Sequence, residues 1–252
     1  MSYQTIEVRI EQSTCFIKLY RPANHNTISR QMVQECTQAL TSFSDSVTII
    51  VIEGLPEIFC LGAEFEDPNA LNPESLIDPA ELFDLWNQLA RGPHISIAHV
   101  KGKVNAGGLG FVAACDIVLT DHTAEFSLSE MLFGLFPACV LPFLIRRVGF
   151  QKANYLTLTT KAISSQQAVD WGLVDACEQN SETLLRKHLL RLRLLSRAGI
   201  HRYKTYMNQL DTILTDSRLN AIAANRLLFS DNETLENIKR YAQTKQFPWE
   251  KD

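Results

Sequence analysis

The sequence has no long apolar run and no surplus of basic residues. None of its apolar stretches approaches the roughly 20 residues that a membrane-spanning helix needs, and residues 1–5 show no basic segment followed by an apolar one. The net charge of -4 at pH 7 gives no overall attraction to nucleic acid. We therefore expect a cytoplasmic protein that binds neither a membrane nor nucleic acid, and whose partner is small or locally recognised.

Paired cysteines and internal repeats are missing as well. The cysteines include no CxxC pair, and no histidine accompanies them at the spacing of metal ligands. The sequence thus predicts no metal and no organic cofactor, and it predicts that the cysteines are small buried apolar residues. They are Cys15, Cys36, Cys60, Cys115, Cys139 and Cys177.

The chain has 252 residues, enough to form one hydrophobic core. Its hydrophobic pattern changes along its length, from strands and helices in alternation to helices alone. Residues 48–54 form a β-branched run that ends in a glycine, which is typical of a buried strand. Residues 29–43 have helical spacing, so a βαβ unit is predicted. We expect a β/α core with the active site over residues 1–190 and a helical region over residues 191–252. Further strands are predicted at 5–9, 15–20, 94–100 and 117–119, a surface loop at 64–79, and helices at 166–171, 184–197, 201–214 and 219–229.

Three segments carry residue types suited to catalysis. Gly62-Ala63 follows a predicted strand, where a backbone N–H can point into a cleft. The glycine-rich stretch 102–110 turns from a strand into a helix, whose first N–H groups suit a developing oxyanion; a glycine-lined packing contact explains it equally well. Glu130 lies among apolar neighbours, which raise the pKa of a carboxyl group and suit a general acid or base. By itself, a helix cap after Ser127 and Ser129 explains this glutamate more simply.

The order and spacing of these segments resemble those of the crotonase (enoyl-CoA hydratase/isomerase) superfamily over nearly the whole chain. The resemblance implies an α/β fold, the crotonase spiral of ββα units, with a helical C-terminal trimerisation region. The blocks that carry it are 19–26, 62–63, 107–108 with 114–117, 126–130, 149–153 and 168–174.

The resemblance also assigns roles. It implies that the backbone N–H groups of Ala63 and Gly107 hold the carbonyl oxygen of a thioester, and that Glu130 is the second of two catalytic glutamates. The first glutamate is expected three residues after Gly107, where this chain has Gly110. That departure disfavours ordinary reversible hydration and leaves Glu130 either to act as both base and acid or to share the work with another group. The implied substrate-binding residues are Leu61, Gly62, Asn105, Gly108 and Leu135.

Longer matches resemble one group within the superfamily, the dehydratases of β-branching cassettes in bacterial polyketide biosynthesis. This likeness implies a lyase that removes water from 3-hydroxy-3-methylglutaryl carried on the phosphopantetheine of an acyl carrier protein, giving 3-methylglutaconyl carrier protein. It also implies a homotrimer or a dimer of trimers. A decarboxylase of the same fold is disfavoured, because no lysine follows Ala63 before Arg91. The matches lie at 53–60, 102–111, 136–147 and 246–250.

Two other functions stay open. An enoyl-thioester isomerase, or another lyase of the superfamily, also keeps only the later glutamate. A non-catalytic module that binds an acyl carrier protein belongs to a different class, and such a module would have no need of Glu130.

Residues outside these segments have two interpretations each. His94 and His99 are core or rim histidines more readily than contacts of the substrate's distal carboxylate. Trp86 and Tyr155 are interpreted as core or interface aromatics. Five cationic residues either meet a phosphopantetheine phosphate and an acidic carrier protein or form a solvated face; they are Lys101, Lys103, Arg146, Arg147 and Lys152.

Overall fold

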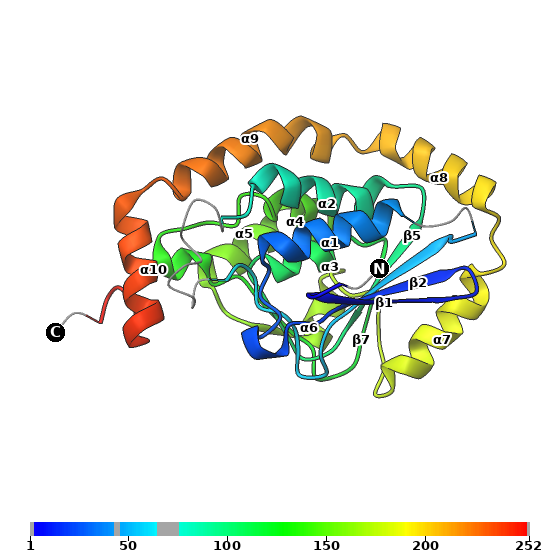
Figure 1. Ribbon diagram of the computed structural model, residues 1–252, viewed down its shortest axis with the longest axis horizontal. Coiled ribbons are helices and arrows are strands. Elements are labelled where there is room, and N and C mark those ends of the chain that lie inside the picture. Colours follow the sequence, from blue (N-terminus) through cyan, green and yellow to red (C-terminus); the bar gives the residue numbers. More distant parts are fainter. Residues whose placement is uncertain (1–2, 43–45, 65–75, 251–252) are drawn as a thin grey trace.

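The computed structural model describes residues 3–42, 46–64 and 76–250 (Figure 1). Its strands form a six-stranded sheet with the order β1-β2-β3-β5-β7-β10 and a four-stranded sheet with the order β4-β6-β8-β9. The larger sheet contains β1 (Ile6–Glu11), β2 (Thr14–Leu19), β3 (Ile49–Glu53), β5 (Ile95–Val100), β7 (Ile117–Thr120) and β10 (Ala176–Cys177). The smaller sheet contains β4 (Ile58–Cys60), β6 (Lys103–Asn105), β8 (Glu125–Ser127) and β9 (Ile163–Ser164).

The helices of the described residues follow the same order along the chain. In the first part they are η1 (Pro22–Asn24), α1 (Arg30–Thr41), α2 (Pro79–Arg91), α3 (Gly108–Ala114) and η2 (Glu130–Phe133). They continue with α4 (Leu141–Val148), α5 (Phe150–Thr159), α6 (Ser165–Asp170), α7 (Ser181–Leu192), α8 (Arg197–Leu210), α9 (Ile213–Leu228) and α10 (Asn232–Thr244).

The predicted hairpin and βαβ unit both lie in the larger sheet. β1 and β2 pair antiparallel, and β2 pairs parallel with β3 across α1. α1 begins after Ser29, whose hydroxyl accepts a hydrogen bond from the Met32 N–H at 3.2 Å, as an N-cap does. β3 is apolar because both faces of the sheet are covered: Ile50 joins the main core, and Val51 packs with leucines of α7.

A short strand follows each of three long strands. β4 follows β3, β6 follows β5 and β8 follows β7, and each pair leads into a helical segment. This recurrence is the α/β spiral of ββα units that the resemblance implied. The short strands have three residues each, too few for a periodic pattern in the sequence. The predicted loop at 64–79 lies mostly outside the described residues, and its last residue, Pro79, begins α2, a helix that the sequence patterns did not reveal.

The C-terminal helices lie along the outer edge of the molecule, where α8 and α9 pass over α2 and α10 turns away toward the C-terminus (Figure 1). Polar contacts hold α8 and α9 to the core. The Lys204 ammonium lies 2.6 Å from Asp116, and Arg218 pairs with Asp84 at 2.6 Å. The predicted division at residue 190 falls in the last turn of α7, and α10 is a helix that the sequence patterns missed.

Three expectations from composition can be compared with the described residues. None of the helices in 3–42, 46–64 and 76–250 is long and apolar enough to cross a membrane. No group of histidine, cysteine and acidic side chains within these ranges could hold a metal. Five of the cysteines are buried as predicted, while Cys177 is half-buried and its sulfur lies 3.3 Å from His122 Nδ1.

Candidate active site

Ala63, Gly107 and Glu130 each lie two or three residues beyond the end of a strand in the smaller sheet. β4, β6 and β8 are parallel neighbours, so their carboxyl ends meet at one edge of that sheet. A cavity of about 710 Å³ lies there, and all three residues line it. Segments far apart in the sequence thus converge on one site.

An isolated parallel bridge to Ile28 orients the backbone at Ala63. The Ile28 N–H donates to the Gly62 carbonyl at 2.7 Å, and the Glu64 N–H donates to the Ile28 carbonyl at 3.4 Å. Because such a bridge uses the residues on either side of Ala63, the N–H of Ala63 itself points away from Ile28. Within the described ranges no backbone carbonyl accepts it. The cavity therefore has one available N–H donor at this position.

Gly107 supplies a second backbone N–H close to the first. It directly precedes α3, where N–H groups lack helical acceptors. A Cβ built on Gly107 would lie 3.9 Å from the Ala63 nitrogen, and one built on Gly62 would lie 3.0 Å from the Gly107 nitrogen. The preceding Ala106 has φ +51°, a left-handed conformation that is strained for a residue with a side chain. Two N–H groups thus adjoin at the cavity, as an oxyanion hole requires.

The other predicted substrate-binding residues divide into two groups. Leu135 lines the cavity, whereas Leu61, Gly62, Asn105 and Gly108 are not among its lining residues. Gly62 and Gly108 each lie so close to a neighbouring segment that a side chain would not fit. A Cβ on Gly62 would lie 2.7 Å from Ala106 Cβ, and a Cβ on Gly108 would lie 2.2 Å from the Cys60 carbonyl oxygen. Their part in substrate binding stays a prediction.

The side chain of Asn105 is directed at the segment that carries Glu130. Its Nδ2 donates to the Ser129 hydroxyl at 2.8 Å, and its Oδ1 accepts from the Ser127 hydroxyl at 2.9 Å. Ser129 therefore does not cap the following turn, for which no side-chain cap is present. The helix-cap interpretation of Glu130 loses its basis, and Asn105 of β6 holds the segment that carries Glu130.

Glu130 has an unusual environment for a carboxylate. The residue as a whole is only half-buried because it lines the cavity, but its Oε2 is shielded and has no hydrogen-bond partner among the described residues. Removal from water raises the pKa of Glu130 to about 7, opposed only by a hydrogen bond from its own backbone N–H. Both protonation states are therefore accessible near neutral pH.

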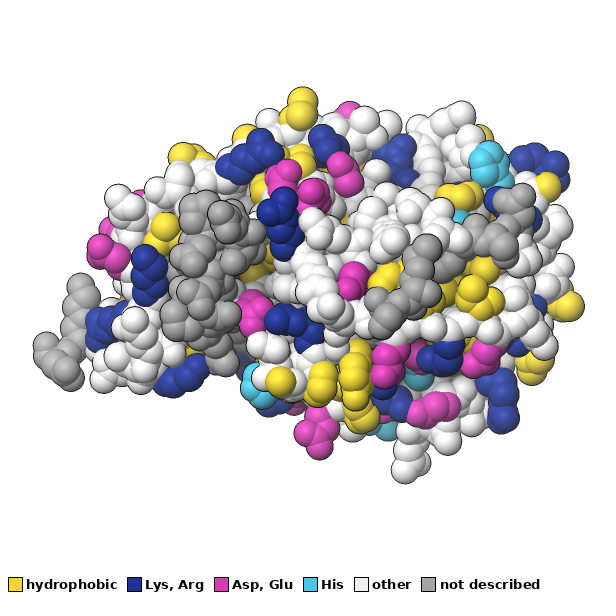
Figure 2. All heavy atoms as spheres, in the orientation of Figure 1, with side chains coloured by type: hydrophobic (Ala, Val, Ile, Leu, Met, Phe, Trp, Pro, Cys, Tyr) yellow, Lys and Arg dark blue, Asp and Glu magenta, His cyan; other side chains and the backbone are white. Residues whose placement is uncertain are grey.

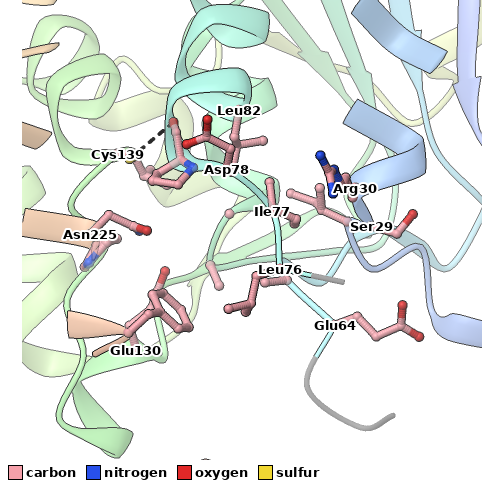
Figure 3. A pocket seen from close by; sticks show the side chains of 18 of the residues that line it. Ser29, Arg30, Glu64, Leu76, Ile77, Asp78, Leu82, Glu130, Cys139 and Asn225 are labelled. Atoms are coloured by element: carbon pink, nitrogen blue, oxygen red, sulfur yellow. Dashed lines mark hydrogen bonds between the residues drawn. The ribbon is translucent and has the colours of Figure 1, made fainter. Parts of the chain in front are cut away.

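Glu64 lies on the other side of the same cavity (Figure 3). Its Oε2 accepts a hydrogen bond from Arg21 at 2.8 Å, and its Oε1 accepts one from Asn24 Nδ2 at 2.6 Å. Arg21 also donates to the Thr27 carbonyl at 2.7 Å. These hydrogen bonds join the turn after β2 to the segment after β4. Glu64 therefore has a structural role.

The space that a side chain at position 110 would need is filled by the indole ring of Trp86. Gly110 lies in the first turn of α3, and a Cβ there would lie 2.4 Å from Cζ2 and 2.6 Å from Cε2 of Trp86. The indole is fully buried, and Phe111 and Phe143 contact it edge-on with centroids 6.0 and 5.9 Å away. A glutamate at position 110 would have to displace this ring. Trp86 is a core aromatic as predicted, and it also lines the cavity.

Sequence reasoning missed the cavity-lining residues of α9. Asn225 and Arg226 of α9, and Phe229 directly after it, line the same cavity as Glu130 and Leu135. Figure 3 shows Asn225 and Glu130 on one side, with Ser29, Arg30 and Glu64 on the other and Leu76 and Ile77 between them. Nothing local distinguishes Asn225 in the sequence, because its place depends on how α9 packs. The active site thus extends beyond residues 1–190.

His99 and four of the cationic residues contact other parts of the protein. His94 and His99 do not line the cavity; His99 instead contacts Glu53 at 3.2 Å and Ser181 at 3.0 Å. Four residues of the cationic group contact different partners. Lys101 pairs with Glu182, and Arg147 pairs with Asp175. Arg146 lies 3.9 Å from Asp211, and Lys152 donates to the Trp171 carbonyl. These four do not form a single anion-binding cluster.

The spiral of ββα units brings two backbone N–H donors and a shielded carboxyl group to one cavity, an arrangement suited to acid and base chemistry beside a carbonyl oxygen. The chain belongs to the enoyl-CoA hydratase/isomerase family, whose sequence profile matches residues 9–252. The predicted family and fold class are confirmed.

Among its relatives, the bacillaene synthase dehydratase PksH of Bacillus subtilis is 52% identical over 99% of this chain and 98% of that protein. The crystal structure of the polyketide biosynthesis enoyl-CoA hydratase pksH from Bacillus subtilis has a TM-score of 0.94, with 51% identity, and covers 98% of this chain and 100% of that one. A methylmalonyl-CoA decarboxylase structure, with a TM-score of 0.80, 18% identity and coverage of 98% of this chain and 97% of that one, shares the fold alone. A shared fold does not fix the reaction, which depends on the residues of the site.

Proposed function

We propose that this enzyme is a lyase that dehydrates 3-hydroxy-3-methylglutaryl on an acyl carrier protein to 3-methylglutaconyl carrier protein in polyketide β-branching. The observation that carries the proposal is the carboxyl group of Glu130, whose Oε2 has no partner among the described residues, in the same cavity as the N–H groups of Ala63 and Gly107. The full-length similarity to a dehydratase of bacillaene synthase supports the choice of reaction and pathway.

The proposed reaction uses Glu130 twice. With the thioester carbonyl oxygen hydrogen-bonded to Ala63 and Gly107, the Glu130 carboxylate removes a proton from the α-carbon, and the electron pair moves onto that oxygen as an enolate. The enolate then returns its electron pair, the bond from the β-carbon to the hydroxyl oxygen breaks, and the protonated Glu130 gives its proton to the departing hydroxide. Water leaves, and the carboxylate is regenerated without a second acid.

The acyl group reaches the cavity on a flexible carrier. A phosphopantetheine thioester supplies the carbonyl that the two N–H groups require, and no further cofactor enters the reaction. An acyl carrier protein is the proposed partner because the similar Bacillus subtilis protein is named for a synthase that makes a polyketide. Pocket residues such as Ile28 and Leu82 give the cavity the apolar walls that an acyl chain needs.

The helical region over residues 191–252 is proposed to form the contact in a homotrimer or a dimer of trimers. Its helices α8 and α9 expose large apolar side chains, each between 58% and 74% accessible: Tyr203, Tyr206, Leu210, Leu219 and Leu227. Figure 2 shows apolar side chains reaching the surface along the edge that α9 forms. Sedimentation should detect an oligomer at micromolar concentration, and a stable monomer would contradict this assembly.

Mass spectrometry of the loaded carrier protein tests the reaction. Incubation of 3-hydroxy-3-methylglutaryl carrier protein with the enzyme should give a product lighter by one water. Loss of carbon dioxide would instead indicate a decarboxylase. An unchanged mass would indicate a binding module or an isomerase, which a separate incubation with an enoyl thioester distinguishes.

A further inference from the structure

The terminal block at 246–250, one of those that resemble the dehydratase group, does not line the cavity. It folds back on the end of α10, because Lys245 takes a left-handed conformation with φ +60°. Two hydrogen bonds fix this turn: Arg240 donates to the Glu250 carbonyl, and the Phe247 N–H donates to Glu250 Oε2 at 2.7 Å. A role for the block must therefore lie outside the cavity.

Aromatic rings join this block to η2. The ring of Phe133, the last residue of η2, has its centroid 5.0 Å from that of Tyr241 and 5.9 Å from that of Phe247. Tyr241 and Phe247 are 5.0 Å apart, and Trp249 stacks on Phe247 at 4.7 Å. Centroid separations in this range are those of attractive aromatic pairs. We call these four residues the aromatic cluster, and through it the C-terminal segment holds a turn that is distant in sequence.

η2 has little to hold it in place by itself. It is a single short turn, and no side chain among the described residues caps it. Its backbone hydrogen bonds include one from the Gly134 N–H to the Met131 carbonyl at 3.3 Å. Bonds of this kind, between residues three apart, have poorer geometry than those of an α-helix. The position of Glu130, the first residue of η2, therefore depends on the contacts of η2 with its surroundings.

Glu130 lies between two such contacts. On one side, the Ser129 hydroxyl accepts a hydrogen bond from Asn105 Nδ2 at 2.8 Å. On the other side, Phe133 packs in the aromatic cluster. Side chains three residues apart in a 3₁₀-helix lie one above the other, so Glu130 and Phe133 are on the same side of η2. A shift of Phe133 would therefore move the side chain of Glu130 with it.

We propose that Tyr241 and Phe247 are positioning residues for Glu130, which they hold in place by packing against Phe133 of η2. The inference rests on the proposed dehydration, in which the Glu130 carboxylate removes the α-proton. A general base must lie within hydrogen-bond reach of that proton, and a displacement of about 1 Å can lower a rate by about a hundredfold. Neither ring lines the cavity, so both act through η2 and not on the substrate.

The same packing keeps water from the carboxyl group of Glu130. Burial raises its pKa to about 7, and no charged side chain of the cavity is among the causes; those that line the cavity are Arg21, Arg30, Glu64, Asp78 and Arg226. A displaced η2 would expose Oε2, which is now shielded. The pKa of Glu130 would then fall toward 4.5, and its carboxylate would become a weaker base. Positioning therefore has a signature that a loss of stability does not produce.

Variants that remove one ring test the inference. Tyr241→Ala and Phe247→Ala each take a ring away from Phe133, and Tyr241→Phe is the conservative variant that keeps it. Arg218→Gln is the matched control, because it breaks an ion pair between α9 and α2 away from the aromatic cluster. All are assayed as full-length chains on 3-hydroxy-3-methylglutaryl carrier protein. Rates are expressed per folded molecule, and unfolding temperatures are measured by circular dichroism.

Both alanine variants should lower kcat by about tenfold to a hundredfold with KM within about twofold of wild type, because the oxyanion hole and the cavity walls keep their contacts. The pH of half-maximal rate should fall below 7, since water reaches Glu130. Tyr241→Phe should restore the wild-type kcat and pH profile. Arg218→Gln should leave both unchanged even where it lowers the unfolding temperature.

Unchanged kcat and pH profile in both alanine variants would overturn the inference and leave the aromatic cluster a stabilising contact alone. A higher KM with unchanged kcat would overturn it too, by moving the effect to substrate binding. If the alanine variants do not fold, Tyr241→Leu and Phe247→Leu, which keep apolar bulk without a ring, are judged by the same criteria.

Failure of the proposed function gives a different result, in which the wild-type chain itself releases no water. The positioning of Glu130 is then decided without substrate, by following the titration of its carboxyl group with ¹³C NMR. The signal of Glu130 is the one that is absent in Glu130→Gln. A lower pKa in Phe247→Ala than in wild type would support the inference, and an equal pKa would overturn it.

Discussion

Glu64 and Glu130 lie on opposite sides of one cavity, and the protein surrounds them differently (Figure 3). Glu64 receives hydrogen bonds from Arg21 and Asn24 on both of its oxygens. Glu130 lies among apolar walls, and its Oε2 has no partner within the described ranges. The same residue type thus forms a structural ion pair at position 64 and is the proposed acid and base at position 130.

The difference shows what prepares a carboxylate for proton transfer. A partner that stabilises the charged form also makes that form a poor base, whereas desolvation destabilises it and raises the pKa. At Glu130 the raised pKa, about 7, comes from burial and not from a neighbouring negative charge. Each prediction below tests one side of this comparison, beginning with the largest expected effect.

Glu130→Gln should lower the rate of dehydration by about a thousandfold to ten-thousandfold while the fold and substrate affinity are kept, because the amide fills the same space but cannot accept the α-proton. The measurement is water loss from the loaded carrier protein, followed by mass spectrometry. Glu64→Gln is the matched control on the other side of the cavity. If the variant kept more than about a tenth of the wild-type rate, Glu130 would not be the general acid or base.

Gly107→Pro should lower the rate by about a hundredfold or more, since proline has no N–H to hold the enolate oxygen. The φ of Gly107, -55°, is one that proline can adopt. Gly107→Ala keeps the N–H and serves as the control, although its Cβ would lie 3.1 Å from Ile28 Cδ1. Circular dichroism establishes that both variants fold. A fully active proline variant would place the oxyanion hole elsewhere.

The rate should rise with pH up to about 7 and then level off, because only the carboxylate form of Glu130 removes the α-proton. A pKa near 7 leaves about one enzyme molecule in a hundred in that form at pH 5, so the rate there should be about a hundredfold below the plateau. Initial rates across this range test the assignment. A profile that is flat down to pH 5 would mean that the base has an ordinary carboxyl pKa.

Folding stability should depend on pH through the same group. The pKa of Glu130 is 4.5 when unburied and about 7 in the folded protein, so between these values the folded state binds more protons than the unfolded state. The contribution of Glu130 is therefore fully present below pH 4.5 and is lost as pH rises to 7, by about 3 kcal/mol. Chemical denaturation at pH 5 and pH 8 should show Glu130→Gln gaining stability relative to wild type at the higher pH. An equal difference at both values would contradict the burial of this carboxylate.

Glu64→Gln should have the smallest effect. Loss of the charge on a largely buried ion pair costs about 1 kcal/mol of stability, since the amide oxygen still accepts one hydrogen bond. The dehydration rate should stay within about threefold of wild type, because no step uses this carboxylate. Denaturation and the water-loss assay measure the two effects. A loss of rate comparable with that of Glu130→Gln would mean that two carboxylates share the reaction.

Much of the fold could be predicted from local patterns. The run from residue 48 to 54 predicts β3 because a strand covered on both faces is apolar throughout, and the spacing after Ser29 predicts α1 because its apolar residues share one face. Helix α2, which begins at the end of a predicted loop, was not predicted. The three-residue strands of the smaller sheet are too short to show an alternating hydrophobic pattern.

The sequence by itself determined the order and spacing of the three candidate segments, and through them the family and the proposed catalytic residues Ala63, Gly107 and Glu130. Only the tertiary structure decided that Asn105 holds the segment of Glu130, that Asn225 of α9 lines the cavity, and that Trp86 lies against Gly110. The physical reason is that patterns along the chain record which face of an element is apolar, whereas shielding, hydrogen bonding and the filling of space depend on contacts between residues distant in sequence.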